Sequence, residues 1–293
     1  MLHVLKETFI DSLLTLPLLF VCYLLLSLIN HNSKAKRVDF KKLNKVGPII
    51  GSAVGLVPQC GFSAAAATLY NEKVILGGTL VAVFFATSDE ALPILLTDIS
   101  ALKYILPLFV LKFILAVIFG FLLNATIFKN DELLLLNEKE ISFNSCENEE
   151  HHKEHKEHKE HKHQYLHLFK HAGEHTLKTA LFIFVTMLVL NFISHELSHE
   201  FLEGILLKGS IFSPLITAAV GLIPGCSISV LITELLINES ISFSAAFAGL
   251  SAGAGFGFVA LCRVKEKKKA IKIIVTCYII SALSGIVLAL FGI

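Results

Sequence analysis

The sequence predicts an all-α polytopic membrane protein with two inverted-topology repeats, proline-broken or re-entrant helices, and about 10 transmembrane segments. Three observations lead to this fold class. The 293 residues are 54% hydrophobic with a mean hydropathy of +0.71, and the apolar residues are gathered in long runs. One octapeptide occurs twice, once in each half of the chain. Basic residues are concentrated in a few loops, which orients the runs relative to the membrane.

The apolar runs account for the predicted spans. Most of them meet or approach the ~20 residues that an α-helix needs to cross a bilayer. They divide the chain into a first membrane repeat at 1–128, a linker at 129–174 and a second membrane repeat at 175–293. The runs lie at residues 9–30, 46–70, 74–96, 104–128, 177–193, 214–237, 241–262 and 271–293.

The repeated octapeptide is AVGLVPQC at residues 53–60 and AVGLIPGC at 219–226. Pro58 and Pro224 each remove a backbone donor and clash with the preceding turn, so a continuous helix should break there. Such a break at membrane depth is tolerated where the freed backbone groups are buried in protein or line a wet cavity. Matching breaks in two halves therefore indicate the substrate site of a transporter. The alternative is a pair of kinked helices in which small cysteines only pack.

The loop charges predict the topology. Residues 31–45 and 263–269 are rich in Lys and Arg, which marks them as cytoplasmic, whereas 97–103 and 194–213 each hold a single Lys and are assigned outside. Each intervening stretch has two apolar runs but must cross an odd number of times. One run is therefore a re-entrant hairpin, or the pair splits into three shorter spans. Both termini are then outside, and the linker at 129–174 is cytoplasmic.

The linker contains a histidine-rich tract, NEEHHKEHKEHKEHKH, at residues 148–163. It has no apolar residues to bury, so we expect it to be disordered or a frayed, solvated helix. Neutral imidazoles bind divalent transition metals, which makes the tract a candidate for metal buffering or sensing. The alternative is a solubilising segment that binds metal incidentally. The accessory metal candidates in the tract are His151, His152, His155, His158, His161 and His163.

Two adjacent acids, Asp89 and Glu90, lie inside the third apolar run. Ionisable residues at membrane depth are costly and are therefore functional candidates. Neighbouring side chains on a helix point about 100° apart, so we expect this helix to be interrupted, which would let Ser88, Asp89 and Glu90 converge. The alternative is that both acids cap a short helix at the outer interface. The corresponding stretch at 251–257 is rich in glycine and carries no acid, so the two half-sites differ.

Cysteines and hydroxyls complete the predicted site. Cys60 and Cys226 lie at the helix breaks, and thiolates are ligands for soft or borderline metals. Glu234 and Lys112 lie within spans and are candidates for a buried pair or a proton-linked group. The predicted metal ligands are Cys60, Asp89, Glu90 and Cys226, and the rest of the predicted substrate path is Gln59, Ser63, Ser88, Ser227, Ser229 and Glu234.

A separate motif, His195-Glu196-Leu197-Ser198-His199, matches H-E-x-x-H, in which two histidines bind zinc and the glutamate acts as general base. It would make the protein an intramembrane metalloprotease. The motif lies at the outer end of its span, however, and no convincing third ligand is visible in a later span. We therefore interpret His195 and His199 as accessory metal ligands of an outer vestibule or as interfacial residues, and expect no enzymatic activity.

Taken together, these motifs resemble those of a known family, the bacterial ten-transmembrane heavy-metal exporters, whose members are labelled arsenic efflux proteins or manganese transporters. The similarity covers essentially the whole chain and is most specific at GLVPQCGFS (55–63) and TSDEA (87–91). It implies a multi-pass protein that exports a metal or metalloid across the bacterial inner membrane. The resemblance leaves the identity of the ion open.

We therefore expect a secondary transporter that exports a divalent heavy-metal ion, manganese first, coupled to protons. The alternative is a permease for arsenite, another metalloid or an oxyanion. The transported metal is the substrate and the lipid bilayer the environment; we expect no cofactor and no nucleic-acid partner. A G-x-x-x-x-G-K-[ST] loop for nucleotide binding is absent from the sequence. A homo-oligomer is left open.

Overall fold

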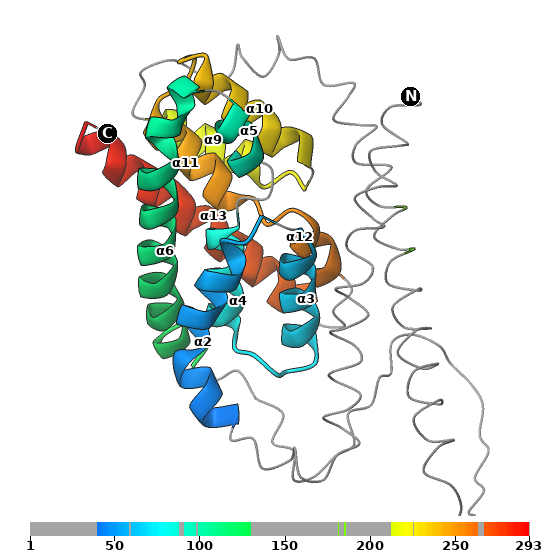
Figure 1. Ribbon diagram of the computed structural model, residues 1–293. Helices are drawn as coiled ribbons and strands as arrows, with labels where there is room; N and C mark the ends of the chain where they lie inside the picture. Colours follow the sequence, from blue (N-terminus) through cyan, green and yellow to red (C-terminus); the bar gives the residue numbers. More distant parts are fainter. Residues whose placement is uncertain are drawn as a thin grey trace, which may run out of the picture.

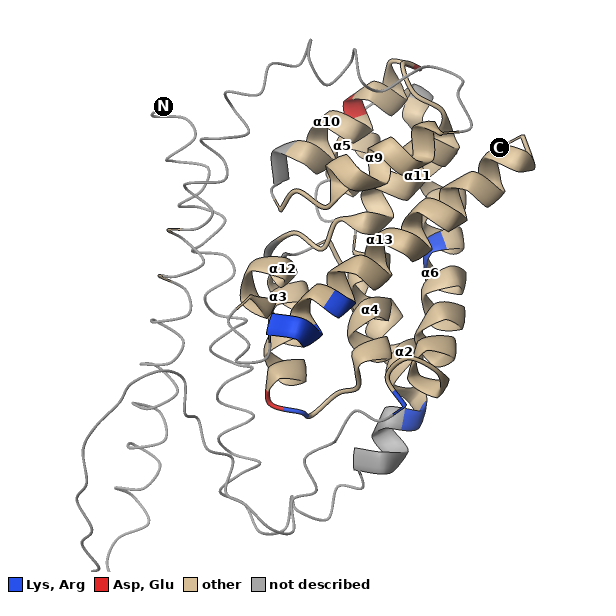
Figure 2. Ribbon diagram, turned by 180° about the vertical axis from the view of Figure 1, so that it is seen from behind, with Lys and Arg blue, Asp and Glu red and all other residues tan. Residues whose placement is uncertain are grey.

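The computed structural model describes residues 40–58, 60–87, 91–97, 99–129, 181, 185, 212–224, 226–262 and 267–292. In this part of the chain the regular structure is helical, without strands. Most of the described ribbon carries no charged residue, as Figure 2 shows. The predicted first span, the histidine-rich tract and the H-E-x-x-H motif lie outside the described residues.

The helices form two series with the same order (Figure 1). Helices α3 and α10 both have 12 residues, α4 and α11 both have 10, and α6 and α13 both have 24. The first series is α2 (Phe40–Gly55), α3 (Cys60–Asn71), α4 (Gly77–Ala86), α5 (Ala91–Thr97), the 3₁₀ helix η2 (Ile99–Ala101) and α6 (Leu102–Ala125). The second series is α9 (Ser213–Gly221), α10 (Cys226–Ile237), α11 (Phe243–Ala252), α12 (Phe256–Leu261) and α13 (Lys267–Leu290).

Four described segments are long and apolar enough to cross a membrane. They are Gly77–Leu96, Leu102–Ala125, Phe243–Leu261 and Lys267–Leu290. The second and fourth are the continuous helices α6 and α13. The first and third each consist of two shorter helices that follow one another in the chain, α4 with α5 and α11 with α12. Two of these candidate spans are therefore interrupted partway along.

Both octapeptides separate two helices. Helix α2 ends at Gly55 and α3 begins at Cys60, so Pro58 lies between them. Helix α9 ends at Gly221 and α10 begins at Cys226, so Pro224 takes the same place in the second series. Neither proline has to fit into a helix interior, where it would remove a hydrogen bond and clash with the preceding turn. The breaks predicted from the two prolines are confirmed.

Contacts along α2 show that the chain reverses its direction between α2 and α3. A Cβ added at Gly47 would lie 2.7 Å from Thr79 Oγ1 near the start of α4, and one at Gly55 would lie 2.5 Å from the Val83 carbonyl oxygen near its end. Helices α2 and α4 are therefore parallel. Because α3 joins the end of α2 to the start of α4, it must run in the opposite direction. Helices α2 and α3 thus form a helical hairpin beside α4, an order of directions that a re-entrant hairpin and three short spans have in common.

The second series repeats this arrangement. A Cβ added at Gly285 of α13 would lie 2.7 Å from Pro214 Cβ, at the start of α9, and 2.9 Å from the Ser244 carbonyl oxygen, at the start of α11. At the other end of α9, Gly221 contacts the carbonyl group of Gly249. Helices α9 and α11 are therefore parallel, and α10 runs back between them.

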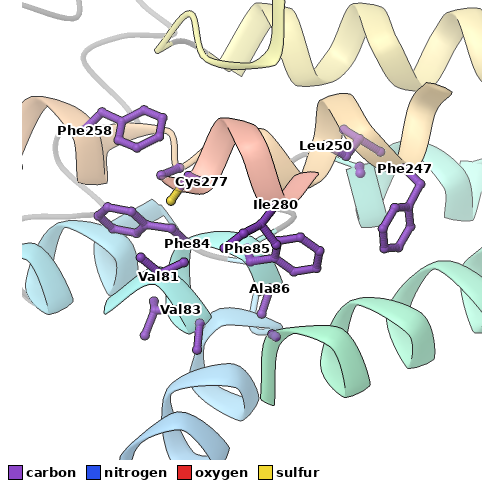
Figure 3. Packing of buried hydrophobic residues seen from close by; sticks show 14 of the residues in the cluster. Val81, Val83, Phe84, Phe85, Ala86, Phe247, Leu250, Phe258, Cys277 and Ile280 are labelled. Atoms are coloured by element: carbon purple, nitrogen blue, oxygen red, sulfur yellow. The ribbon is translucent and has the colours of Figure 1, made fainter. Parts of the chain in front are cut away.

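The short helices α5 and α12 each pack against a helix of the other series. Helix α12 packs on α3, and α5 packs on α10 (Figure 1). At the first of these contacts the Asn71 side chain donates a hydrogen bond to the Ala260 carbonyl, at 3.4 Å. Aromatic rings join the series as well: Phe84 of α4 meets Phe258 of α12 with centroids 5.4 Å apart, and Phe85 meets Phe247 of α11 at 6.0 Å (Figure 3). The two series thus share one hydrophobic core.

Helices α3 and α10 end in matching turns. Lys73 and Glu239 follow these helices with φ of 58° and 54°, and the amide after each bonds back to the carbonyl of Leu69 or Leu235. A left-handed residue with this bond pattern is the Schellman cap, which satisfies carbonyls that have no partner within the helix.

Glu72 in the first of these turns should make stability depend on pH. Burial raises the pKa of its carboxyl above the ordinary value of 4.5. The folded state then binds a proton more strongly than the unfolded state, so stability falls as the pH rises from 4.5 through the raised pKa. Glu72→Gln should therefore unfold at a higher temperature than the wild type near neutral pH, with a smaller difference below pH 4.5. Thermal unfolding in detergent micelles at both pH values checks this; a difference independent of pH would contradict it.

Candidate functional site

Helices α4 and α11 approach the middle of α6 from opposite ends. The start of α4 lies beside the end of α6, where the Gly78 amide donates a hydrogen bond to Asn124 Oδ1 at 2.9 Å. The start of α11 lies beside the start of α6, where the Phe243 ring stacks on Tyr104 with centroids 6.0 Å apart. Since α6 is continuous, α4 and α11 run toward each other and their C-terminal ends meet between these two contacts.

Lys112 lies at this meeting point. Along the axis of α6 it is about 12 Å from Tyr104 and about 18 Å from Asn124, at 1.5 Å per residue. Its side chain is fully buried, at 0% exposure. The Nζ atom donates hydrogen bonds to the carbonyl oxygen of Thr87 at 2.6 Å and to that of Leu250 at 2.7 Å. One cation thus connects the ends of two half-helices, one from each series.

The two carbonyls come from helix ends that suit a cation. Thr87 is the C-cap of α4, and Leu250 lies in the last turn of α11. The last carbonyls of a helix lack donors within the helix, and the aligned peptide dipoles place negative partial charge there. Two such ends pointing at each other would repel without a positive charge between them. The Lys112 ammonium supplies that charge.

The proposed pairing of Lys112 with Glu234 does not occur as a buried pair, because Glu234 is exposed on α10. The carbonyl partners of Lys112 were missed by sequence reasoning. The available signal was that Lys112 is the only charged residue in the apolar run at 104–128. Its partners could not be identified from spacing, since Leu250 is 138 residues away along the chain.

The hairpin tips lie beside the interruptions of the candidate spans. Gly55 at the end of α2 is close to Val83 and Ala86, just before the break between α4 and α5. In the second series a Cβ added at Gly253, in the break between α11 and α12, would lie 3.0 Å from the Gly221 carbonyl oxygen at the end of α9. The fold therefore brings the first octapeptide next to the end of α4, which precedes the acidic stretch in the chain, and the second next to the glycine-rich stretch.

The predicted path residues are described to different extents. Ser63 of α3 is buried at 1% exposure, and a Cβ added at Gly257 of α12 would lie 3.0 Å from its Cβ. Ser229 is half-buried on α10, and its carbonyl accepts a hydrogen bond from Thr233 at 2.7 Å. Ser63 thus faces the glycine-rich stretch of the other series.

Other predicted ligands are placed only by their backbone or not at all. Cys60 and Cys226 are the first residues of α3 and α10, and Ser227 follows in α10; their side chains are outside the description. Among the described residues, no three His, Cys, Asp or Glu side chains come together as a metal site. The remaining path residues, Gln59, Ser88, Asp89 and Glu90, lie outside the described residues.

The break before α12 depends on Gly255, whose φ of 48° and ψ of −126° are open to glycine but not to side-chain-bearing residues. Gly255→Ala should destabilise the protein by about 1–3 kcal/mol, the usual cost of such strain. Thermal unfolding in detergent measures the loss. Glu239→Gly is the reverse control: it places glycine at a left-handed position and should leave stability unchanged or raise it. Equal effects of the two substitutions would contradict the backbone assignment.

Long apolar spans, two of them interrupted, with helix ends meeting at a buried charge, are typical of membrane transporters. The chain matches the model of a family described as "putative, 10TM heavy-metal exporter", over residues 1–173 and 167–292. The chain belongs to this family, and is thus a multi-pass membrane protein of a heavy-metal exporter family. Comparison with curated proteins and with solved structures found no match.

Proposed function

We propose that the protein is a secondary transporter that exports a divalent heavy-metal ion, manganese first, in exchange for protons. The observation that carries the proposal is the convergence of two half-helix C-termini on one buried cation, Lys112. Discontinuous helices in transporters use such ends and unwound carbonyls to bind cations near the bilayer midplane. Family membership supports metal export, and the proposed substrate and coupling ion go beyond it.

The acidic segment that follows α4 favours a cation over an oxyanion as the substrate. Helix C-termini carry negative partial charge, whereas anion sites are built from helix N-termini. The acids Asp89 and Glu90 follow directly after Thr87 in the chain and add negative charge to the same segment. We propose that one of them is the cation ligand and the other the proton carrier, or that one residue alternates between these roles.

Cys60 and Cys226 are the proposed sulfur ligands. Each is the first residue of its helix, α3 or α10, where the dipole favours a negative group such as a thiolate. Gln59, Ser63, Ser88, Ser227, Ser229 and Glu234 complete the proposed path. Thiols would also bind trivalent arsenic, so arsenite is the second candidate substrate.

We further propose that the two helix series are inverted repeats, with both termini outside and the histidine-rich linker in the cytoplasm, where it loads or senses metal. Support comes from equivalent contacts: a Cβ at Gly120 would lie 2.7 Å from Pro48 Cβ, and one at Gly285 would lie 2.7 Å from Pro214 Cβ. Helices α4 and α11, which correspond in this comparison, approach α6 from opposite ends.

A growth screen tests the function. A strain that lacks the protein should become sensitive to one ion among manganese, zinc, cobalt, copper, arsenite and arsenate, and should accumulate it. Expression of the full chain should restore resistance. Sensitivity to manganese supports the first candidate and sensitivity to arsenite the second. Unchanged sensitivity to every ion would contradict the export hypothesis.

One variant distinguishes the transporter from the metalloprotease alternative. If the H-E-x-x-H motif were catalytic, Glu196→Gln alone would abolish function, because the glutamate would be the general base. We expect Glu196→Gln to retain resistance in the same strain, with expression checked by immunoblotting.

A further inference from the structure

The Lys112 ammonium group has the kind of surroundings in which transporters bind a free cation, namely backbone carbonyls at helix ends. Its Nζ atom donates hydrogen bonds to carbonyl oxygens at two helix ends, at 2.6 and 2.7 Å, and its side chain is shielded from solvent. Backbone carbonyls at unwound or terminal helix segments are the ligands that cation-coupled transporters use for Na⁺. Here the tethered ammonium group occupies the place where such an ion would be bound.

We propose that the ends of α4 and α11 form a monovalent-cation site that Lys112 permanently occupies in place of a coupling ion. The site belongs to the backbone of both series, since Thr87 ends α4 and Leu250 lies in the last turn of α11. The buried charge is held in place by carbonyls that would otherwise lack partners at the helix ends. The wild-type protein then needs no alkali cation, either to join the two half-helices or to export metal.

The rest of α6 is consistent with a role for the Lys112 charge rather than for side-chain bulk. The neighbouring buried positions on this helix are apolar or small, namely Leu108, Ala116 and Gly120. The corresponding buried position of the other 24-residue helix, α13, counted from its first residue, is Cys277, which is uncharged. The Lys112 ammonium therefore binds the helix ends of both series.

Lys112→Ala keeps Cβ and removes the side chain from Cγ to Nζ, which has the size and charge of a propylammonium ion. The space that these atoms filled is then empty. The unfolding midpoint of this full-length variant should be higher in sodium, potassium or propylammonium chloride than in choline chloride at the same ionic strength, by about 5 °C or more. Lys112→Met fills the space without a charge and should be destabilised to the same extent in every salt. The wild type and Lys103→Ala, which removes an exposed lysine at the start of α6, should not distinguish the salts.

Three outcomes would overturn the proposal. One is a Lys112→Ala variant whose midpoint is equal in all four salts. Another is a Lys112→Met variant as stable as the wild type, since the charge would then be unnecessary. The third is failure to recover Lys112→Ala with any of these cations, because occupancy by a free cation is the predicted rescue. Export by the wild type should also be unaffected when choline replaces sodium and potassium; this second readout rests on the proposed function, whereas the unfolding measurement does not.

Discussion

Asp89→Asn and Glu90→Gln are each expected to abolish resistance to the exported metal. Both residues follow Thr87 closely in the sequence, and the Thr87 carbonyl at the C-terminal end of α4 accepts a hydrogen bond from the Lys112 ammonium. Each substitution keeps the shape of the side chain and removes the negative charge that would bind a metal or carry a proton. Loss of an outer-shell partner at a metal site costs 10–100-fold, so loss of a direct ligand should lower the export rate by more than ~100-fold.

The measurement is growth of the complemented deletion strain on graded metal, together with the initial rate of export from loaded cells. Glu239→Gln is the matched control, because this acid is exposed after α10 and, in the described part of the chain, pairs with the exposed Lys103 at 3.6 Å. An exposed pair of this kind contributes little to stability. Full resistance in both Asp89→Asn and Glu90→Gln, at normal expression, would exclude these acids from the path.

Gly221→Val is expected to prevent stable assembly of the second hairpin on α11. A Cβ at this position would overlap the Gly249 carbonyl group, and backbone cannot move aside as a flexible side chain can. Overpacking of a close-packed interior costs about 1–3 kcal/mol, and the backbone contact puts this substitution at the upper end or beyond. The fraction of monodisperse protein after purification and its unfolding temperature should both fall.

Ala219→Val is the control for helix propensity, since it adds a β-branched side chain at an exposed position of the same helix. The first series offers the same comparison. Gly55→Val should be destabilising, because an added Cβ would lie 2.5 Å from the Val83 carbonyl oxygen, and Ala53→Val is exposed and should be tolerated. Equal behaviour of the glycine and alanine variants would show that the hairpins do not lie against α4 and α11 as described.

Local chemistry explains which features could be predicted from sequence. Pro58 and Pro224 would remove a donor and clash with the preceding turn in a helix interior, and α2 and α9 end just before them, although Pro48 and Pro107 lie within α2 and α6. The interruption between α4 and α5 follows in the same way from a polar stretch inside an apolar run. These breaks need no knowledge of the rest of the fold.

Features that depend on contacts far apart in the sequence could not be predicted. The loop charges required an odd number of crossings but gave no directions for the individual helices; the contacts of Gly47 and Gly55 with α4 show that α2 and α4 run parallel and that α3 runs back. The packing of α5 on α10 and of α12 on α3 has no local signal. The same is true of Lys112, whose charge was visible in the sequence but whose carbonyl partner Leu250 is supplied by the other series.

Transport in a purified system tests the central claim most directly. The full chain is reconstituted into liposomes that contain a dye quenched by Mn²⁺, and a proton gradient is imposed. We expect manganese to enter the vesicles faster than in protein-free liposomes, faster with the gradient than without it, and at background rate with Asp89→Asn. Metal flux at the protein-free rate for manganese, zinc and cobalt alike, with the protein folded in the vesicles, would contradict a divalent-cation exporter.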